Sequence, residues 1–390
     1  SLQICNENLG TNGVAIVSYN TFPGWHARGM IRSMMLYHTS SAVDLNAPNS
    51  NDLSGGLINT SELTGPGARV GRAREFANFL YESVSSDGYG LMLKKEIEEL
   101  QRARDSYFLH EHLEGLNDPI YFHKFVEKLA KHGLKYLGDA TFSSMISTNL
   151  GTAAHETLQK MSSDFVMLEQ YMDFLRNRTF RQSLLCHQNA PLSRALNPNS
   201  LVPFFISSDE LISDTEINLD SEGTHTLRHG KQTVVIRSPI TKAAFKHLLK
   251  IAPASIKFEN LVEIAKSAYA KALQLEEPSF EFASEALGAE LLYAFGLGVI
   301  SLHTVSDRFV TELSERPVAS LLARQQSRKE QGFSTNQRHQ AMYLNVFQRQ
   351  VLELLDGNRD LDQIRKELLA ASKAGKFIMQ KNGANLDPTT

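Results

Sequence analysis

One apolar segment near the N-terminus constrains the fold more than any other feature of the sequence. Residues 13–20 (Gly-Val-Ala-Ile-Val-Ser-Tyr-Asn) follow a tight turn at Asn12-Gly13 and form a near-continuous apolar run. Such a run is typical of a parallel strand that is covered on both faces. Parallel neighbours are joined by crossover helices, and none precedes this segment. We therefore expect its partner strands later in the chain, or in an earlier segment that this chain lacks.

Later segments supply further strands and helices. Asp118-Pro119 is a good helix start, and Gly133 closes that helix before a short strand at 134–137. A second helix is expected over 163–177 and a second strand over 180–187, with Cys186 as a buried packing residue. Residues 1–190 therefore indicate an α/β fold, the C-terminal half of a Rossmann-like sheet. A mainly helical insertion at about 23–117 interrupts it, with helices over 25–38, 72–84 and 91–107 and a polar loop over 41–69.

Composition excludes several classes of protein. The chain has 390 residues, of which 42% are hydrophobic and 21% charged, so it is neither disordered throughout nor fibrous. A net charge of −3 argues against a globally basic nucleic-acid coat protein. Its two cysteines, Cys5 and Cys186, cannot form a disulfide framework, which favours a cytoplasmic location. We find no signal peptide at the start and no apolar run of about 20 residues that would span a membrane.

The second half of the chain divides into two smaller domains. Residues 191–305 and 306–390 both combine helices with short β-ribbons, which predicts winged-helix-like modules that are mostly α-helical. Asp360 and Gln363 form a capping-box-like pair at the start of one C-terminal helix. Acidic residues lie among and beside the basic residues of 324–349, so a protein-binding surface is favoured over a DNA-binding one; they are Glu312, Glu315, Glu330, Glu353 and Asp356.

Several long motifs resemble one family. They are residues 17–30, the segment 110–125 with His110, Glu111, Tyr121 and His123, residues 171–187, the segment 315–324, and residues 355–360. These motifs are similar to the predicted methyltransferase regulatory region of bacterial protein lysine methyltransferases, including those that modify outer-membrane proteins. The resemblance implies a class I fold, S-adenosylmethionine as donor and a polypeptide substrate. The donor-binding glycine loop and ribose-binding acid of such a fold are not visible, and Gly65 to Gly71 have the wrong spacing for that loop.

The expected site lies at the carboxyl end of the first strand, since ligands bind there in open α/β sheets. By the resemblance, this strand lies beside the methyl-transfer site. We expect Tyr19 and Glu111 to be catalytic, and Ser18 and Tyr19 to contact the cofactor. Substrate-binding residues are expected to be Asn20, Trp25, His110, Tyr121 and His123.

Simpler roles remain open for these residues. Tyr19 and Trp25 could only anchor the insertion, and Glu111 could pair with Arg102 or Arg104. His110 and His112 are two residues apart, which does not fit the four-residue spacing of helical zinc ligands, so no metal is expected.

Two functions from different classes follow. The first is the substrate-recognition and regulatory part of a methyltransferase acting on protein lysines. The second is a non-catalytic binding module that forms a homodimer through the helical insertion or through winged-helix contacts. DNA binding through the winged helices is a third, less favoured function.

Overall fold

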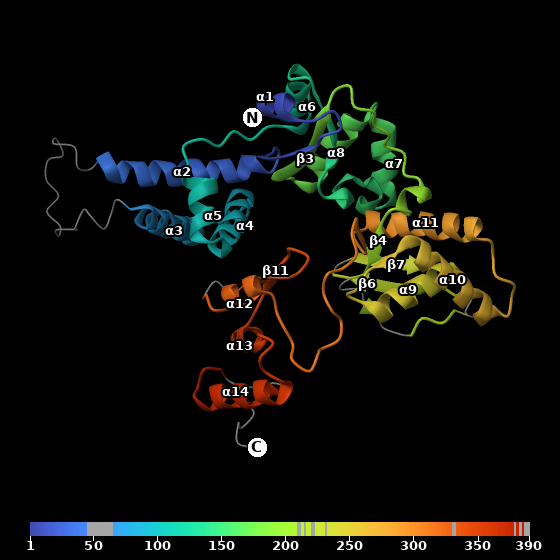
Figure 1. The fold of residues 1–390 in the computed structure, drawn as a ribbon. Coiled ribbons are helices and arrows are strands. Elements are labelled where there is room, and N and C mark those ends of the chain that lie inside the picture. The colour runs from blue at the N-terminus through green and yellow to red at the C-terminus, as the bar shows by residue number, and fades with distance from the viewer. Residues whose placement is uncertain are drawn as a thin grey trace. The chain divides into compact units, whose positions relative to one another are not determined.

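The computed structural model describes residues 1–44, 65–208, 212–213, 216–219, 223–230, 232–329, 333–377, 380–381 and 384–385. Most of the expected polar loop over 41–69 lies outside these ranges. The chain forms two compact units (Figure 1). The first contains residues 1–195 with 296–298, and the second contains residues 196–295 with 299–390.

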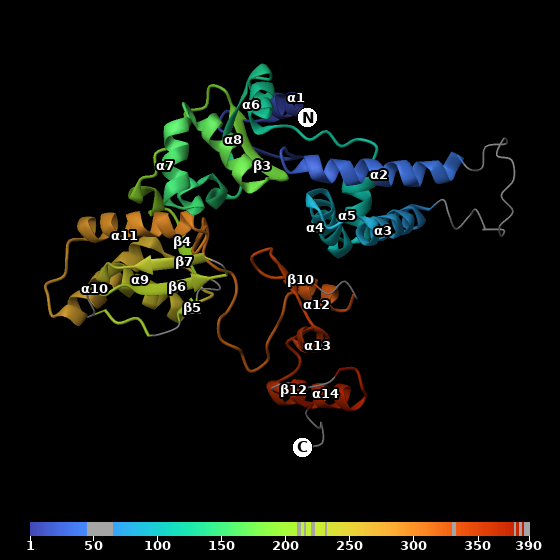
Figure 2. The same ribbon diagram turned by 180° about the vertical axis from the view of Figure 1, so that it is seen from behind.

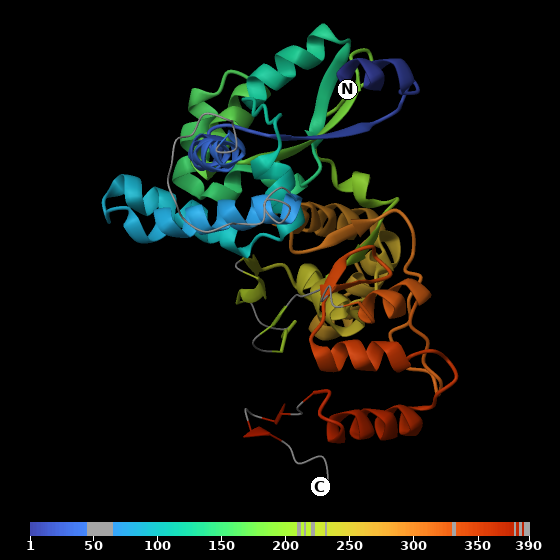
Figure 3. The same ribbon diagram turned by 90° about the vertical axis from the view of Figure 1, so that its left-hand side faces the viewer.

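The first unit is built on a three-stranded sheet. Its strands are β1 (Ala15–Asn20), β2 (Leu134–Asp139) and β3 (Phe180–His187), in the order β1-β3-β2. Both pairings are antiparallel, so the expectation that the first strand lies beside parallel neighbours is wrong for the described strands. The strand β3 lies between the other two, which run parallel to each other. Figure 3 shows β1, in blue, beside the green strands.

The apolar run of β1 has one solvent-exposed face and one buried face. Ile16 is 65% exposed, while the Val17 side chain on the opposite face packs into the core. The expectation that both faces are covered is therefore wrong for the described part of the chain. The run of apolar residues predicted the strand correctly but not which of its faces is buried. Apolar side chains are often, but not always, buried.

Helices cover the inner face of this sheet. They are α1 (Leu2–Asn8), α6 (Phe122–Lys131) and α8 (Phe165–Arg176), and α7 (Thr152–Met161) packs against α8 (Figure 2). Phe122, Phe125 and Leu129 project from α6 onto Tyr136 and Leu185 of the sheet. Phe122 is fully buried, as its helical spacing predicts.

Helix α6 begins later than predicted. Its first residue is Phe122 rather than a residue at Asp118-Pro119. The reason is a bridge between Ile120 and Thr21, in which the Ile120 N–H donates to the Asn20 carbonyl oxygen at 3.0 Å. The Thr21 hydroxyl donates to the Ile120 carbonyl oxygen at 2.7 Å. These bonds hold the segment before α6 extended along the end of β1.

The insertion is helical, as predicted. It contains α2 (Trp25–Asp44), α3 (Pro66–Ser83), α4 (Gly88–Arg102), α5 (Asp105–Phe108) and a π-helical turn at Leu109–Leu113. The expected helix over 91–107 is in fact two, because the chain turns at Ala103 and Arg104. Gly67 and Gly71, of the glycine cluster, lie inside α3. Ile31, Met35, Leu93 and Ile97 are fully buried in a core of their own.

The second unit starts with two small sheets. One has β4 (Phe205–Ser207) between β8 (Ile256–Lys257) and β9 (Ser301–His303), and the other contains β5 (Ile212–Ser213), β6 (His225–His229) and β7 (Gln232–Ile236). The helices α9 (Pro239–Ile251), α10 (Phe258–Leu273) and α11 (Phe280–Gly296) accompany them. The apolar patterns over 204–207 and 233–237 predict strands β4 and β7, and those over 241–251, 259–273 and 284–295 predict the three helices, each to within about four residues of the observed bounds.

The last part is a winged-helix domain. Its elements are α12 (Leu321–Ser327), the hairpin β10 (Phe333–Thr335) and β11 (Ala341–Tyr343), α13 (Val346–Leu354), α14 (Leu361–Lys373) and the strands β12 (Gln380–Lys381) and β13 (Ala384–Asn385). The predicted capping box at Asp360 and Gln363 is present. None of the helices in the described ranges has the length and apolarity needed to cross a bilayer.

Candidate functional site

A polar network lies at the carboxyl end of β1. Asn20 is the last residue of that strand, and its amide nitrogen donates to Glu111 Oε2 at 3.0 Å and to Asn117 Oδ1 at 3.2 Å. The Asn117 amide in turn donates to the Glu111 carbonyl oxygen at 2.9 Å. Two asparagines therefore fix both the backbone and the carboxylate of Glu111. The sequence predicted Asn20 and Glu111 for one site, and they are in direct contact.

An aromatic cluster comes from the same end of β1, the start of α2, the start of α6 and the last turn of α8. We define it as Phe22, His26, Tyr121, His123 and Phe174. The Phe22 ring stacks on His26 with centroids 4.3 Å apart and lies 5.1 Å from Tyr121. The Tyr121 hydroxyl is 3.0 Å from His26 Nε2, and the Tyr121 ring contacts His123 and Phe174. Two predicted substrate residues belong to this cluster: Tyr121, which precedes α6, and His123 in its first turn.

The backbone on either side of one main-chain hydrogen bond joins the aromatic cluster to the polar network. Phe22 follows Asn20 by two residues, and Tyr121 follows Ile120, whose N–H donates to the Asn20 carbonyl oxygen. Main-chain hydrogen bonds therefore bring a carboxylate, an amide and several π faces to one end of a strand. That combination can bind a cation and accept a proton from it.

Trp25 and His112, which follows Glu111 in the chain, form a buried aromatic pair. Their rings stack at 5.7 Å, and both side chains are buried at 1% exposure. Burial lowers the pKa of His112 to about 4, with further lowering by the Arg28 and Arg32 guanidinium groups. Trp25 Nε1 and His112 Nδ1 have no hydrogen-bond partner among the described residues. Trp25 thus occupies a core position, which corresponds to the anchoring alternative for this residue.

Tyr19 points to the inner face of the sheet. Its hydroxyl lies 3.1 Å from Ser183 Oγ and its ring stacks on Phe125 at 4.0 Å. Burial raises the pKa of Tyr19, so the phenol stays neutral across the physiological range. Ser18 lies on the opposite, exposed face of the strand. Among the described residues, the network bonds of Asn20 go to Glu111 and Asn117, while the Tyr19 hydroxyl is bonded to Ser183 on the other face of the strand.

His110 does not join the network either. Its side chain is exposed, on the π-helical turn that carries Glu111. Glu111 accepts from Asn20, while Arg102 pairs with Glu99 at 3.2 Å. Within the described ranges no group of three or more His, Cys, Asp and Glu side chains is placed to hold a metal ion.

A buried ion cluster lies below Tyr19. The Arg181 guanidinium donates to both Asp173 oxygens at 2.8 Å and to Glu169 Oε2 at 3.0 Å, and it lies 3.9 Å over the Phe122 ring. Arg178 donates to Asp139 Oδ2 at 2.6 Å. Burial raises the pKa of Glu169 and of Asp173 against the opposing effect of Arg181. This cluster fixes α8 to β3 and so fixes the positions of Phe174 and Tyr121.

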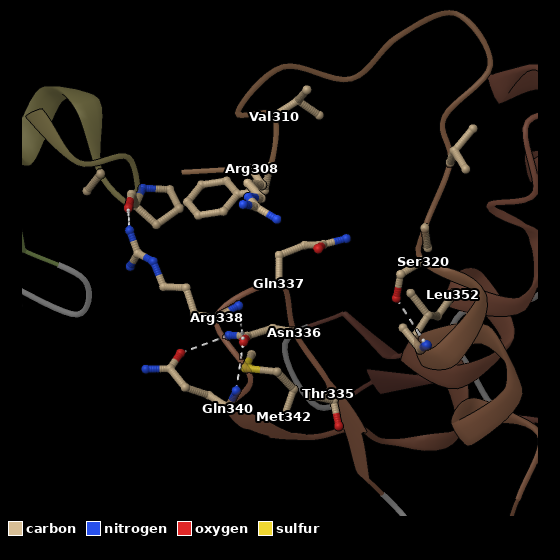
Figure 4. A pocket seen from close by; sticks show the side chains of 16 residues that line it. Arg308, Val310, Ser320, Thr335, Asn336, Gln337, Arg338, Gln340, Met342 and Leu352 are labelled. Carbon is tan, nitrogen blue, oxygen red and sulfur yellow. Dashed lines mark hydrogen bonds between the residues drawn. The ribbon is translucent and has the colours of Figure 1, made fainter. Parts of the chain in front are cut away.

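A separate cavity of about 790 Å³ lies in the second unit (Figure 4). It is lined by Arg308 and Phe309, by Gln337 and Arg338 before β11, and by Leu352 of α13. Arg338 donates to the Pro253 carbonyl oxygen at 2.6 Å and to Asp307 at 3.0 Å. None of the site residues predicted from the sequence lines this cavity.

Three residues of the site escaped the sequence analysis as site residues. Phe22, Asn117 and Phe174 were seen only as members of motifs. Asn117 had a usable signal, because a polar residue just before Asp118-Pro119 often makes a side-chain bond to a nearby backbone group. Phe174 had none, since its helical spacing with Tyr171 equally suits a core position.

Two family descriptions match this chain. Residues 104–187 match the predicted methyltransferase regulatory domain, which includes Glu111, Asn117, Tyr121 and Phe174. Residues 315–390 match the C-terminal winged helix domain of PKMT. Two solved structures of PKMT2 from Rickettsia typhi are also similar, one of them in complex with AdoHcy.

The similarity to these structures extends along almost the whole chain. The AdoHcy complex is 27% identical, covers 98% of this chain and 71% of that chain, and gives a TM-score of 0.77. The other PKMT2 structure is also 27% identical. The match covers 96% of this chain and 69% of that chain, with a TM-score of 0.73.

Uncharacterized proteins of Rickettsia prowazekii are similar in sequence. One is 28% identical over 393 residues, which is 99% of this chain and 66% of that relative. A second is 33% identical over 138 residues, 35% of this chain and 47% of the relative. The chain thus spans just under two thirds of the first relative's length. The similarity to methyltransferases thus has two local parts, the predicted methyltransferase regulatory domain over residues 104–187 and the PKMT winged helix domain over residues 315–390.

Proposed function

We propose that this chain is the substrate-recognition and regulatory part of a methyltransferase that modifies lysine side chains of proteins, with S-adenosylmethionine as donor. The observation that carries the proposal is the Glu111 carboxylate, held by Asn20 at the end of β1 beside the aromatic cluster. The related PKMT2 in complex with AdoHcy supports the identity of the donor.

The residues of the site suit the acceptor. A lysine ammonium has to lose a proton before its nitrogen can attack a methyl group, and Glu111 can receive that proton. The hydrogen bond from Asn20 fixes the direction in which the carboxylate points. The faces of Phe22, Tyr121 and Phe174 attract a cation and exclude water from one side of it. The bound donor supplies the methyl group.

The experiment compares Glu111→Gln with Glu114→Gln in the full-length protein. Glu114 is an exposed neighbour whose carboxylate makes no hydrogen bond to another described residue. Methyl transfer from labelled S-adenosylmethionine to polypeptides is measured. We expect Glu111→Gln to lower the rate roughly 10²-fold, the usual size of a general-base contribution. Equal rates for the two variants would remove Glu111 from the proposed role.

We also propose a homodimer, a cytoplasmic location and domain boundaries for this chain. A homodimer through the helical insertion is supported by its large exposed apolar side chains, among them Phe79, Tyr89 and Leu91. The free state of Cys5 and Cys186 is compatible with a cytoplasmic location. We further propose domain boundaries near residues 190 and 305, and the boundary between the two compact units at 195/196 supports the first. His110 and Tyr19 remain candidates that the same labelling assay can test.

A further inference from the structure

An apolar groove lies between α7 and α8. It has a volume of about 400 Å³ and includes Ala153, Ala154 and Met161 from α7 with Tyr171, Phe174 and Leu175 from α8. None of its lining side chains carries a charge. A groove of this size, lined in this way, suits one or two apolar side chains.

The large side chains of the groove are open to solvent. Met161 is 53% exposed, Phe174 is 45% exposed and Leu175 is 60% exposed. Isolated exposed apolar residues are ordinary, but several in one concave surface are typical of a binding site.

The groove shares a wall with the aromatic cluster. The Phe174 ring makes edge contacts with Tyr171 at 6.2 Å and with Tyr121 at 6.1 Å. The Tyr121 hydroxyl in turn is within hydrogen-bond distance of His26 Nε2, at 3.0 Å. A polypeptide whose lysine reaches the cluster therefore passes next to the groove, because consecutive residues of an extended chain are only about 3.3 Å apart.

We infer that the groove is a specificity subsite that takes an apolar side chain flanking the target lysine of a polypeptide. This inference rests on the proposed lysine methyltransferase function. The shared Phe174 wall favours the substrate as the occupant, and the uncharged lining favours leucine or methionine over an acidic or basic residue.

The test uses two fluorescein-labelled peptides with the full-length protein. In one a central lysine is flanked by leucines within three residues on each side, and in the other by serines at the same positions. Binding is measured by anisotropy without donor, and methylation is measured separately. The variants are Met161→Ser and Leu175→Ser, both on exposed side chains. The matched control is Leu275→Ser, since Leu275 is 55% exposed and lies outside the groove.

We expect the leucine peptide to bind about tenfold more tightly than the serine peptide, the discrimination that one apolar side chain provides in a pocket. Met161→Ser and Leu175→Ser should each reduce that preference severalfold, while Leu275→Ser should keep it. Equal binding of the two peptides, no binding of the leucine peptide, or a preference that survives in both groove variants would overturn the inference.

Two further outcomes are informative. One tests the proposed function independently of the groove, and the other tests whether a second copy of the chain occupies the groove. A leucine preference without any methylation would sink the proposed function and leave the groove as a peptide-binding site. A homodimer that dissociates in Leu175→Ser, measured by sedimentation, would assign the groove to a second copy of the chain and overturn the substrate assignment.

Discussion

The residue after Glu111 in the chain is His112, whose side chain is buried at 1% exposure. His112 packs between Trp25 and Phe108, and its pKa is lowered to about 4, mainly because burial disfavours the imidazolium. The unfolded chain binds a proton at His112 near pH 6.5, and the folded chain does not until about pH 4. The stability from this group is therefore full above about pH 6.5 and is lost as the pH falls toward 4.

This linkage gives a prediction at the residue scale. Between about pH 7.5 and pH 5, the free energy of unfolding should fall by about 2 kcal/mol more in the unmodified protein than in His112→Leu. Urea unfolding at the two pH values measures it. His110→Leu, which changes the exposed histidine two residues away, should keep the full pH dependence. Identical pH dependence in the unmodified protein and His112→Leu would contradict the buried neutral state.

At the same scale, the sequence identified the polar partners better than the orientations. It placed Asn20, Glu111, Tyr121 and His123 in one region, and the structure brings Asn20 to Glu111 and Tyr121 to His123. It could not determine which face of β1 the Tyr19 phenol occupies. That face depends on Ser183 and Phe125, more than 100 residues away in the chain.

At the scale of elements, the contact of α8 with β3 depends on one buried cation. Arg181→Met would leave the carboxylates of Asp173 and Glu169 buried without their main partner. The expected loss of stability is about 3–5 kcal/mol, measured by denaturant unfolding. Arg102→Met, which breaks an exposed pair with Glu99, should cost less than about 0.5 kcal/mol. A loss below about 1 kcal/mol for Arg181→Met would mean that the cluster does not hold the two elements together.

Helix α14 offers a second test at this scale. The Asp360 carboxylate accepts from the Gln363 N–H at 2.8 Å, and the Gln363 side chain accepts from the Asp360 N–H at 2.9 Å. Asp360→Ala should cost about 1 kcal/mol and so increase hydrogen exchange of the α14 amides about fivefold. Lys366→Ala, on the exposed side of the same helix, should not increase exchange. Unchanged exchange in Asp360→Ala would show that the capping box contributes little.

Elements with strong local signals were predictable, and those determined by distant contacts were not. The capping box of α14 and the helices α9 and α10 follow from patterns within a few residues. Helix α7 was missed because its Ala-Ala-His-Glu-Thr start lacks an apolar stripe. The start of α6 was misplaced because Thr21, about 100 residues earlier, holds Ile120 extended.

At the scale of the whole molecule, the first unit carries the proposed lysine site and its groove, and the second carries the winged-helix domain. The sequence predicted the α/β class, because composition and periodicity are properties of long segments. It could not show that β3 lies between β1 and β2, since strand order depends on pairings that no local pattern records.

In the proposed function, the site at the end of β1 presents a lysine nitrogen to a methyl donor. The most direct test is to incubate the full-length protein with S-adenosylmethionine and a lysine-containing polypeptide, and to map the methylated atom by tandem mass spectrometry. We expect methyl groups on lysine Nζ and their loss in Glu111→Gln but not in Glu114→Gln. Methylation at another kind of side chain, or no transfer by the unmodified protein, would contradict it.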